Sequence, residues 1–220
     1  MTTKTKAHII YKTKDGRRVA GVTTITEQLI EYQEKRNIIK WANNLGLEGE
    51  DSDAYRDEMG EIGKLAHYLI VCDYKGIKPD LSDNTQKQID KAENCLIKFW
   101  MWRRGHTVEP LHLEMPQVSE VYRYGGTLDF LGNIDGILTI KDIKTSAQLY
   151  PKNFFQIAGY DGLVKENLNL VPEQYLLLRL GRDESEGFEV RVTTNIEPYW
   201  RIFLALLEVY NLKKQITKEK

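Results

Sequence analysis

Residues 125–145 read GGTLDFLGNIDGILTIKDIKT, with Asp135-Gly136 between two apolar runs. Asp-Gly in such a setting is the strongest short-range signal for a β-hairpin, because a two-residue type I′ turn needs positive φ at both of its central positions. If these two residues form the turn, counting outward along both strands places Asp129 opposite Asp142. The stretch therefore predicts a hairpin that carries two carboxylates on one face.

Lys144 follows Asp142 by two positions and joins the same face, because side chains alternate along a strand. Opposed Cβ atoms lie ~5 Å apart, and two carboxylates at that separation repel by roughly 3 kcal/mol at an effective dielectric of about 20. Two arrangements would offset this repulsion. A hard cation such as Mg²⁺ could bind between Asp129 and Asp142, or Lys144 could neutralise one of them in a structural ion pair. The hairpin alone leaves both open.

Apolar residues are predicted on both faces of this hairpin. One face carries Leu128, Phe130, Ile134, Ile137 and Ile143. The other carries Leu131, Leu138 and Ile140. Strands that are apolar on both faces are covered on both sides, so we expect the hairpin near the centre of a sheet between helices.

Two helices carry further polar residues. The segment 153–166 has helical spacing and places Gln156 and Tyr160 on one face at i, i+4. Upstream, a helix beginning near Glu61 carries Gly63 and His67 on a stripe separate from its apolar residues. On chemistry alone, a single helical histidine is more often a surface or satisfied polar residue than a metal ligand.

Four motifs of this chain, read together, resemble a known family. The order Gly126-Thr-Leu-Asp129, Asp142-Ile-Lys144-Thr and Gln156-Ile-Ala-Gly-Tyr160 resembles the PD-(D/E)XK nuclease superfamily in its RecB-like branch, which includes phage nucleases and the mitochondrial genome maintenance exonuclease. The segment from Gly63 to His67 resembles the helix that precedes the catalytic hairpin in that branch. The resemblance implies an α/β fold with a restriction-endonuclease-like core, a mixed central β-sheet flanked by helices, and an N-terminal helical region.

The resemblance also implies a metal site. Asp129, Asp142 and the backbone carbonyl of Ile143 would hold Mg²⁺, for which Mn²⁺ would substitute, and His67 would be an additional ligand. Lys144 would be the catalytic lysine.

Further roles come from the same resemblance. Gln156 and Tyr160 would position the substrate backbone or the lysine. Glu120, nine residues before Asp129, would be an outer metal ligand, with Glu114 as its rival. For both glutamates the plain alternative is a surface carboxylate.

The whole chain has 220 residues, which fits a single nuclease domain. We expect a mostly helical part over 1–105, the catalytic sheet and the Gln-Tyr helix over 106–192, and a C-terminal helix over 193–220. Its two cysteines, Cys72 and Cys95, are too few for a four-cysteine iron–sulfur cluster and have no zinc-site spacing.

Charge and terminal sequence bear on partners and location. A net charge of −1 gives no global field that would attract nucleic acid, so any affinity for DNA must come from local basic patches. The N-terminus lacks the apolar core of a signal peptide, and no apolar run has the length of a membrane helix, so we expect a cytoplasmic protein without membrane contact. No P-loop motif is present, so ATP-driven work would need a protein partner.

The predicted function is metal-dependent hydrolysis of DNA, with an exonuclease favoured over an endonuclease, in DNA processing, recombination or repair of a phage-like kind. DNA with single-stranded character or a free end is the expected substrate. Two alternatives stay open: a nuclease-fold module that binds DNA or protein without cleaving, and a nuclease directed at RNA.

Local patterns predict the remaining elements. They are a small hairpin over 8–23, a capping box at Thr24–Glu27 opening a helix over 25–45, an acidic loop over 51–57, a helix over 84–104, strands over 108–115, 119–124, 174–180 and 188–192, and a helix over 196–214. In the helix over 84–104 we expect Phe99 and Trp100 in the core, with Trp102, Arg103 and Arg104 open to a nucleic-acid strand.

Overall fold

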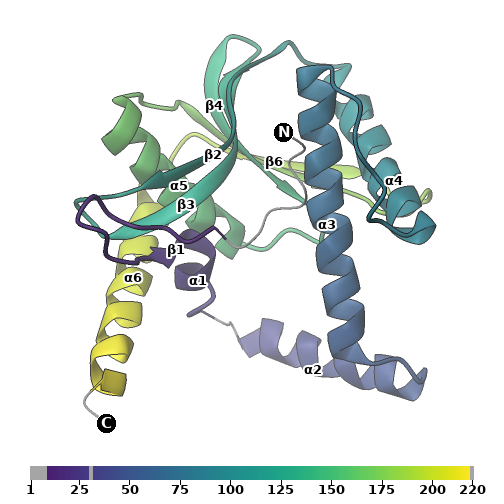
Figure 1. Ribbon diagram of the computed structural model, residues 1–220, viewed down its shortest axis with the longest axis horizontal. Helices are drawn as coiled ribbons and strands as arrows, with labels where there is room; N and C mark the ends of the chain where they lie inside the picture. Colours follow the sequence, from purple (N-terminus) through teal and green to yellow (C-terminus); the bar gives the residue numbers. More distant parts are fainter. Residues whose placement is uncertain (1–8, 30–31, 219–220) are drawn as a thin grey trace.

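The computed structural model describes residues 9–29 and 32–218. Its elements in chain order are β1 (Ala20–Gly21), α1 (Val22–Thr26), α2 (Tyr32–Leu47), α3 (Ser52–Lys75), α4 (Gln86–Arg103), β2 (Val108–Val118), β3 (Tyr124–Ile134), β4 (Ile137–Lys144), α5 (Lys152–Leu168), β5 (Gln174–Leu180), β6 (Phe188–Thr193) and α6 (Glu197–Lys218). The strands form one sheet, with α3 and α4 on one side of the molecule and α1, α5 and α6 on the other (Figure 1).

The sheet is mixed. Its six strands run in the order β1-β3-β4-β5-β6, with β2 paired to β3. The pairs β1–β3 and β4–β5 are parallel, and the pairs β2–β3, β3–β4 and β5–β6 are antiparallel. The predicted α/β fold with a mixed central sheet flanked by helices is confirmed.

The hairpin of β3 and β4 turns where the sequence predicts. Asp135 and Gly136 have φ values of 53° and 83°, as a type I′ turn requires, and Ile134 pairs with Ile137. The Asp135 carboxylate also accepts a hydrogen bond of 2.8 Å from the backbone N–H of Thr107. The turn is thereby held by its own conformation and by the chain that enters β2.

The two strands of the hairpin part before they reach Tyr124. Backbone pairing between β3 and β4 runs from the turn to Phe130–Lys141, and further along the same edge β3 pairs with β1 instead. In an uninterrupted ladder the N–H of Ile143 would donate to a β3 carbonyl. It donates instead to Oδ2 of Asp129 at 2.9 Å, so the sheet opens at this aspartate.

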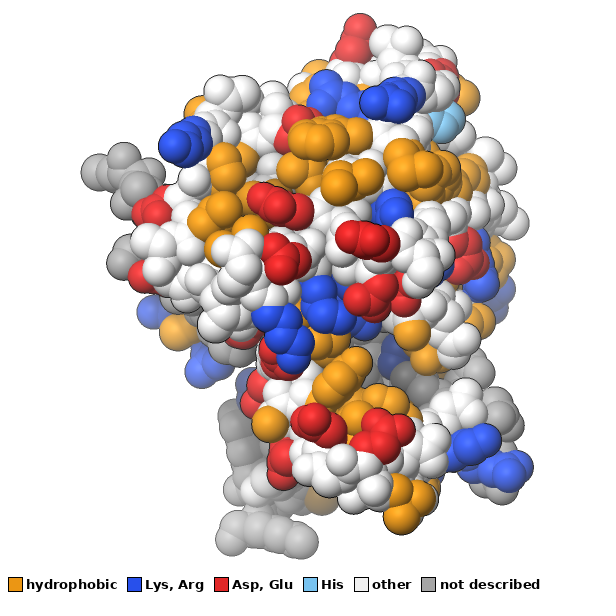
Figure 2. Space-filling view, turned by 90° about the vertical axis from the view of Figure 1, so that its right-hand side faces the viewer, with side chains coloured by type: hydrophobic (Ala, Val, Ile, Leu, Met, Phe, Trp, Pro, Cys, Tyr) orange, Lys and Arg blue, Asp and Glu red, His pale blue; other side chains and the backbone are white. Residues whose placement is uncertain are grey.

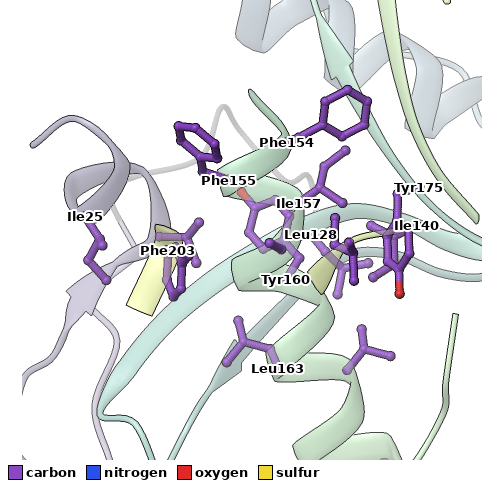
Figure 3. Packing of buried hydrophobic residues seen from close by; sticks show 14 of the residues in the cluster. Ile25, Leu128, Ile140, Phe154, Phe155, Ile157, Tyr160, Leu163, Tyr175 and Phe203 are labelled. Atoms are coloured by element: carbon purple, nitrogen blue, oxygen red, sulfur yellow. The ribbon is translucent and has the colours of Figure 1, made fainter. Parts of the chain in front are cut away.

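Two hydrophobic cores cover the two faces of the sheet. The first joins the sheet to α1, α5 and α6, and Figure 3 shows part of it, including Ile25, Leu128, Tyr160 and Phe203. The second joins the sheet to α3 and α4 and includes Phe99, Trp102, Phe130 and Ile143.

The prediction that Leu128 shares a face with Phe130 is wrong, because Leu128 packs in the first core and Phe130 in the second. The alternation of side chains between the two faces of the sheet is therefore interrupted between Leu128 and Phe130. The neighbouring residue on β2 is Glu114, whose φ of 51° departs from extended geometry.

The N-terminal hairpin is present, although His8 lies outside the described residues. Lys12 pairs with Arg18, and the N–H of Val19 donates to the carbonyl of Tyr11. The single helix predicted over 25–45 is wrong: α1 ends at Thr26 and α2 is a separate helix. The capping box is also wrong, since β1 runs directly into α1 and Gly21 takes the N-cap position.

Three other predictions need correction. The acidic segment predicted as a loop is helical from Ser52 onward, because the Asp51 side chain caps α3 by accepting from the N–H of Ala54 at 2.8 Å. In α4 the tryptophans exchange roles: Trp102 is 2% exposed, whereas Trp100 is 43% exposed and donates to Asp73. The segment 119–123 is a turn, and β3 begins only after it.

The face that includes α4 has no single charge sign. Figure 2 shows basic and acidic side chains interspersed with exposed hydrophobic ones on this side of the molecule. On α4 the exposed hydrophobic residues are Ile97, Trp100 and Met101. No helix in the described part of the chain is long and apolar enough to cross a membrane. The two cysteines are buried and unpaired.

Candidate active site

Three elements bring one candidate metal-binding group together. His67 of α3, Glu114 of β2 and Asp129 of β3 each offer a ligand atom, and these atoms lie within 4.8 Å of one another. His67 Nδ1 lies 3.4 Å from Asp129 Oδ1 and 3.6 Å from Glu114 Oε1. The side chains are 24%, 15% and 11% exposed for His67, Glu114 and Asp129 respectively. The group is therefore recessed but still reached by solvent.

The backbone explains why these side chains meet. Glu114 stands between Leu113, which pairs with Phe130, and Met115, which pairs with Leu128. It is therefore the neighbour of Asp129 across the β2–β3 ladder. A φ of 51° for a glutamate within a strand is a strained conformation that costs of the order of 1–3 kcal/mol, and such strain is typical of functional sites.

A glycine lets α3 approach the end of β4. A Cβ atom on Gly63 would lie 3.0 Å from Oγ1 of Thr145, tighter than ordinary van der Waals contact. Gly63 stands one helical turn before His67, on the same face of α3. A larger side chain there would press this part of α3, and His67 with it, away from the sheet.

Asp142 and Lys144 form the second part of the site. Their side chains lie on one side of β4, with Lys144 Nζ 2.7 Å from Asp142 Oδ2. Asp142 is only 1% exposed. Burial raises the pKa of Asp142 to about 6, and the nearby charge of Asp129 adds to this rise, while the cation of Lys144 opposes it. Asp142 does not belong to the group formed by His67, Glu114 and Asp129.

Asp129 is shifted in the opposite direction. Burial by itself would raise the pKa of Asp129, but the charge and hydrogen bond of His67, the charge of Lys144 and the N–H of Ile143 together lower it. For His67, burial by itself would lower the pKa, and the carboxylate of Asp129 raises it above the usual value. The carboxylate of Asp129 and the imidazole of His67 therefore each favour the charged form of the other.

A chain of hydrogen bonds connects Lys144 to α5. Lys144 Nζ donates to Oε1 of Gln156 at 2.9 Å, and Nε2 of Gln156 donates to the hydroxyl of Tyr160 at 2.7 Å. Tyr160 reaches this position because the neighbouring strand residue is Gly126, where a Cβ atom would lie 2.8 Å from the tyrosine ring. The pair at i, i+4 on α5 thus orients the lysine from the helix side.

Each of the two carboxylates, Asp129 and Asp142, lies beside a basic side chain, which offsets the repulsion between them. The ammonium group of Lys144 lies 2.7 Å from Asp142, and the imidazole of His67 lies 3.4 Å from Asp129. The ion pair of Lys144 and Asp142, one of the two arrangements that the hairpin left open, is present. The group that could hold a metal ion combines Asp129 with His67 and Glu114 and does not include Asp142.

The structure places Glu120 outside this site. The Glu120 carboxylate accepts from the N–H of Lys14 at 2.6 Å and lies 3.7 Å from Nη1 of Arg123. Glu120 lies in the turn between β2 and β3, and its own N–H donates to the side chain of Glu166 on α5. The rival carboxylate, Glu114, occupies the position expected of Glu120. The register of β2 against β3 brings Glu114 there. That register cannot be read from the number of residues between a glutamate and Asp129.

The backbone of Ile143 faces the opening between β3 and β4. Its N–H donates to Asp129, and the N–H and C=O of one residue point to the same side of a strand. The Ile143 carbonyl is therefore directed toward the side on which Asp129 lies, as a ligand role for this carbonyl requires.

Sequence reasoning missed Lys141, which alternation places on the other face of β4. Lys141 is 0% exposed, and its Nζ lies 2.7 Å from the hydroxyl of Tyr74. Aromatic rings surround it, namely those of Tyr74, Phe99, Trp102 and Phe130, at 4.2–5.1 Å from Nζ to each ring centroid. Burial lowers the pKa of Lys141 well below its usual value. Its position between Ile140 and Asp142 in an apolar strand was the available signal.

No family model and no curated protein matches the chain. Among solved structures, a candidate exonuclease from Eubacterium rectale aligns at 13% identity and a TM-score of 0.46, over 69% of this chain and 65% of that chain.

A second structural similarity spans more of the chain. The alkaline exonuclease LHK-Exo from Laribacter hongkongensis aligns at 13% identity and a TM-score of 0.38, over 92% of this chain and 95% of that chain. Its complex with dAMP aligns at 11% identity and the same TM-score. At these identities and TM-scores, function has to be argued from the side chains of the site.

Proposed function

We propose that this protein is a metal-dependent nuclease that hydrolyses phosphodiester bonds in DNA. The observation that supports it most is the convergence of His67, Glu114 and Asp129 within 4.8 Å of one another, next to the ion pair of Asp142 and Lys144. A binding module has little use for so many partly buried charges in one place, because each costs desolvation free energy. A hydrolase uses carboxylates, imidazole and lysine of this kind together.

The donor set fits a hard divalent cation. Two carboxylates and one imidazole suit Mg²⁺ or Mn²⁺ better than a thiolate-binding metal. Asp142 and the backbone carbonyl of Ile143, both on β4, are proposed as further ligands. When bound, the ion supplies positive charge to the phosphate and lowers the pKa of a water molecule. An iron–sulfur cluster is not part of the proposal.

Lys144 is proposed as the catalytic lysine. Its ammonium group is fixed by Asp142 at 2.7 Å and by Gln156 at 2.9 Å, so it is preorganised beside the carboxylates. A fixed cation at this place stabilises negative charge that develops on the phosphate in the transition state. Gln156 and Tyr160 are positioning residues that act through the lysine.

The finer parts of the proposal follow the motif resemblance to the RecB-like branch of the PD-(D/E)XK superfamily. They are an exonuclease preference, a substrate with single-stranded character or a free end, and a phage-like role in DNA processing, recombination or repair in the cytoplasm. A protein partner would be needed for any ATP-driven step.

The test is a digestion panel. Wild-type protein should degrade end-labelled linear DNA in Mg²⁺ or Mn²⁺ and should leave circular DNA intact if it is an exonuclease. Asp129→Asn should abolish cleavage, whereas Glu120→Gln should preserve it. A parallel RNA substrate distinguishes the nucleic acid. Wild-type protein that binds DNA but cleaves neither DNA nor RNA, over a range of metals and ends, would favour the non-cleaving reading.

A further inference from the structure

A groove next to the candidate metal site shares Tyr160 with the residues that were given a role above. It has a volume of about 990 Å³. It is formed by the N-terminal hairpin, β1, α1 and β3, with one residue each from α3 and α5 and two from α6. In Figure 1 the N-terminal hairpin, α1 and α6 lie together at one side of β3.

The groove lies beside the candidate site, because Tyr160, whose hydroxyl accepts a hydrogen bond from Gln156, also lines the groove. Thr127 lines the groove and precedes Asp129 by two positions on β3, a separation of ~7 Å along a strand. Lys64 lines it too and precedes His67 by one helical turn, ~5 Å along α3. The groove therefore comes close to Asp129 along β3 and to His67 along α3.

The charge of the groove differs from that of the whole protein. Its charged lining residues in the described part of the chain are three cations, Arg18, Lys64 and Lys214, and one carboxylate, Glu27. Arg18 and Lys214 are exposed, and Lys64 also lies 2.6 Å from Glu61. The chain as a whole carries a net charge of −1. The groove is thus a local basic track on a protein with no general attraction for a polyanion.

The lining of the groove also includes apolar and aromatic side chains. Ile9 and Ile10, which are 41% and 55% exposed, line the groove together with Tyr11 and Tyr210. The ring of Tyr11 is fixed in place: it packs against the backbone of Gly125, where a Cβ atom would lie 2.4 Å from the ring, and its hydroxyl is 2.9 Å from Oγ1 of Thr127.

We propose that this groove binds a single strand of DNA next to the phosphate that is cleaved, which makes a single strand or a frayed end, not an intact duplex, the substrate. The inference rests on the proposed nuclease function. A groove that combines cations with aromatic and apolar surface matches a strand whose bases are unstacked, because phosphates contact the cations and base faces contact the rings. In a duplex the base faces are stacked on each other and would leave the apolar surface unmatched.

Binding is measured separately from cleavage by fluorescence anisotropy in the Asp129→Asn background. The probes are a labelled mixed-sequence DNA strand and the same strand in a blunt duplex. We expect the single strand to bind more tightly. Adding Arg18→Ala and Lys214→Ala should weaken binding of the single strand and lower the slope of log affinity against log salt by about 1.4, since each lost contact contributes about 0.7.

A matched pair of cations provides the control. Lys87→Ala with Arg191→Ala removes two positive charges from α4 and β6, away from the groove, and should leave both affinity and slope unchanged. Tyr210→Ala should weaken binding at least about fivefold through lost stacking, and Tyr210→Phe, which keeps the ring, should restore it. Unchanged thermal unfolding of these variants shows that the fold is intact.

The outcomes separate this inference from the proposed function. If wild-type protein cleaves DNA but the Arg18 and Lys214 variant binds and cleaves normally, the groove inference is wrong and the nuclease stands. If the strand binds in a groove-dependent way but no metal supports cleavage, the groove stands and the nuclease is wrong. Equal affinity for the blunt duplex, or an equal effect of the control pair, overturns the groove inference.

Discussion

Glu114 and Glu120 offer a paired test of where the metal binds. Each is changed to glutamine, which keeps the shape of the side chain and removes its charge. In Glu114→Gln one carboxylate of the group within 4.8 Å is lost. In Glu120→Gln the new amide oxygen still accepts from the N–H of Lys14, and the candidate site is untouched. Asp129→Asn serves as the positive control, because its amide oxygen can still accept from Ile143 and so preserve the opened sheet.

The expected magnitude follows from linkage between binding and unfolding. An ion that binds only the folded protein stabilises it by about 2.7 kcal/mol at a free concentration 100 times its Kd. For a chain of 150–250 residues each kcal/mol raises the Tm by about 2–4 °C, so wild-type protein should gain about 5–11 °C. Glu120→Gln should gain as much, whereas Glu114→Gln and Asp129→Asn should gain little or nothing.

The assay is thermal unfolding with and without MgCl₂ or MnCl₂, with EDTA as the metal-free reference. Isothermal titration calorimetry of the same four proteins gives the Kd directly. A metal shift that survives in Glu114→Gln and disappears in Glu120→Gln would return the ligand role to Glu120. An equal shift in all four proteins would locate the ion elsewhere.

Three other changes test the rest of the site and the sheet behind it. Lys144→Ala should cut turnover by about 10²–10³ with little change in DNA affinity, because its charge matters mainly as the transition state forms; single-turnover kinetics that retain full rate would refute this role. Gln156→Ala should cut turnover less, and its effect should largely vanish in the Lys144→Ala background if it acts only through the lysine. Lys141→Met combined with Tyr74→Phe should raise the free energy of unfolding by about 1–3 kcal/mol at neutral pH, because it removes a buried amine and the hydroxyl bonded to it. Burial lowers the pKa of Lys141 in the folded protein. Between that lowered pKa and the ~10.4 of an unfolded lysine, unfolding takes up a proton, so the stability of the wild-type protein rises with pH. The advantage of the double variant should shrink over the same range, which chemical denaturation at several pH values checks.

The hairpin could be predicted from sequence because all of its determinants are local. A two-residue turn at Asp135-Gly136 fixes the register, and the register fixes which residues face each other. The placement of Lys144 beside Asp142 follows from alternation alone, and the i, i+4 spacing of Gln156 and Tyr160 follows from helix geometry.

Glu114 illustrates what local reasoning leaves out. The strand that carries it meets β3 through a five-residue turn over 119–123, which does not fix a register as a type I′ turn does. The contact with Asp129 depends on that register and on a positive φ within β2. The signal that was present was a carboxylate at the centre of a largely apolar segment, between Leu113 and Met115.

The predicted helix boundaries were wrong for a different physical reason. The apolar spacing over 25–45 continues through a break between α1 and α2, since periodicity reports a common face and not an unbroken backbone. In α4 the two tryptophans lie on different faces, and tertiary contacts decide their exposure: Trp102 packs in the core with Phe99, whereas Trp100 donates to Asp73 on α3.

The segment Lys141-Asp142-Ile143-Lys144 carries two lysines near one aspartate, and the pleat of the strand decides which of them serves the site. Lys144 is two positions from Asp142 and reaches its carboxylate at 2.7 Å. Lys141 is one position away, so it points through the sheet into the aromatic cage, where it is 0% exposed. Lys141 therefore cannot replace Lys144 in the site, although Lys141 is closer than Lys144 to Asp142 in the sequence. Lys144→Ala should leave Asp142 without a cation at its carboxylate, and a slip of β4 by one residue would exchange the two lysines and disrupt both the site and the second core.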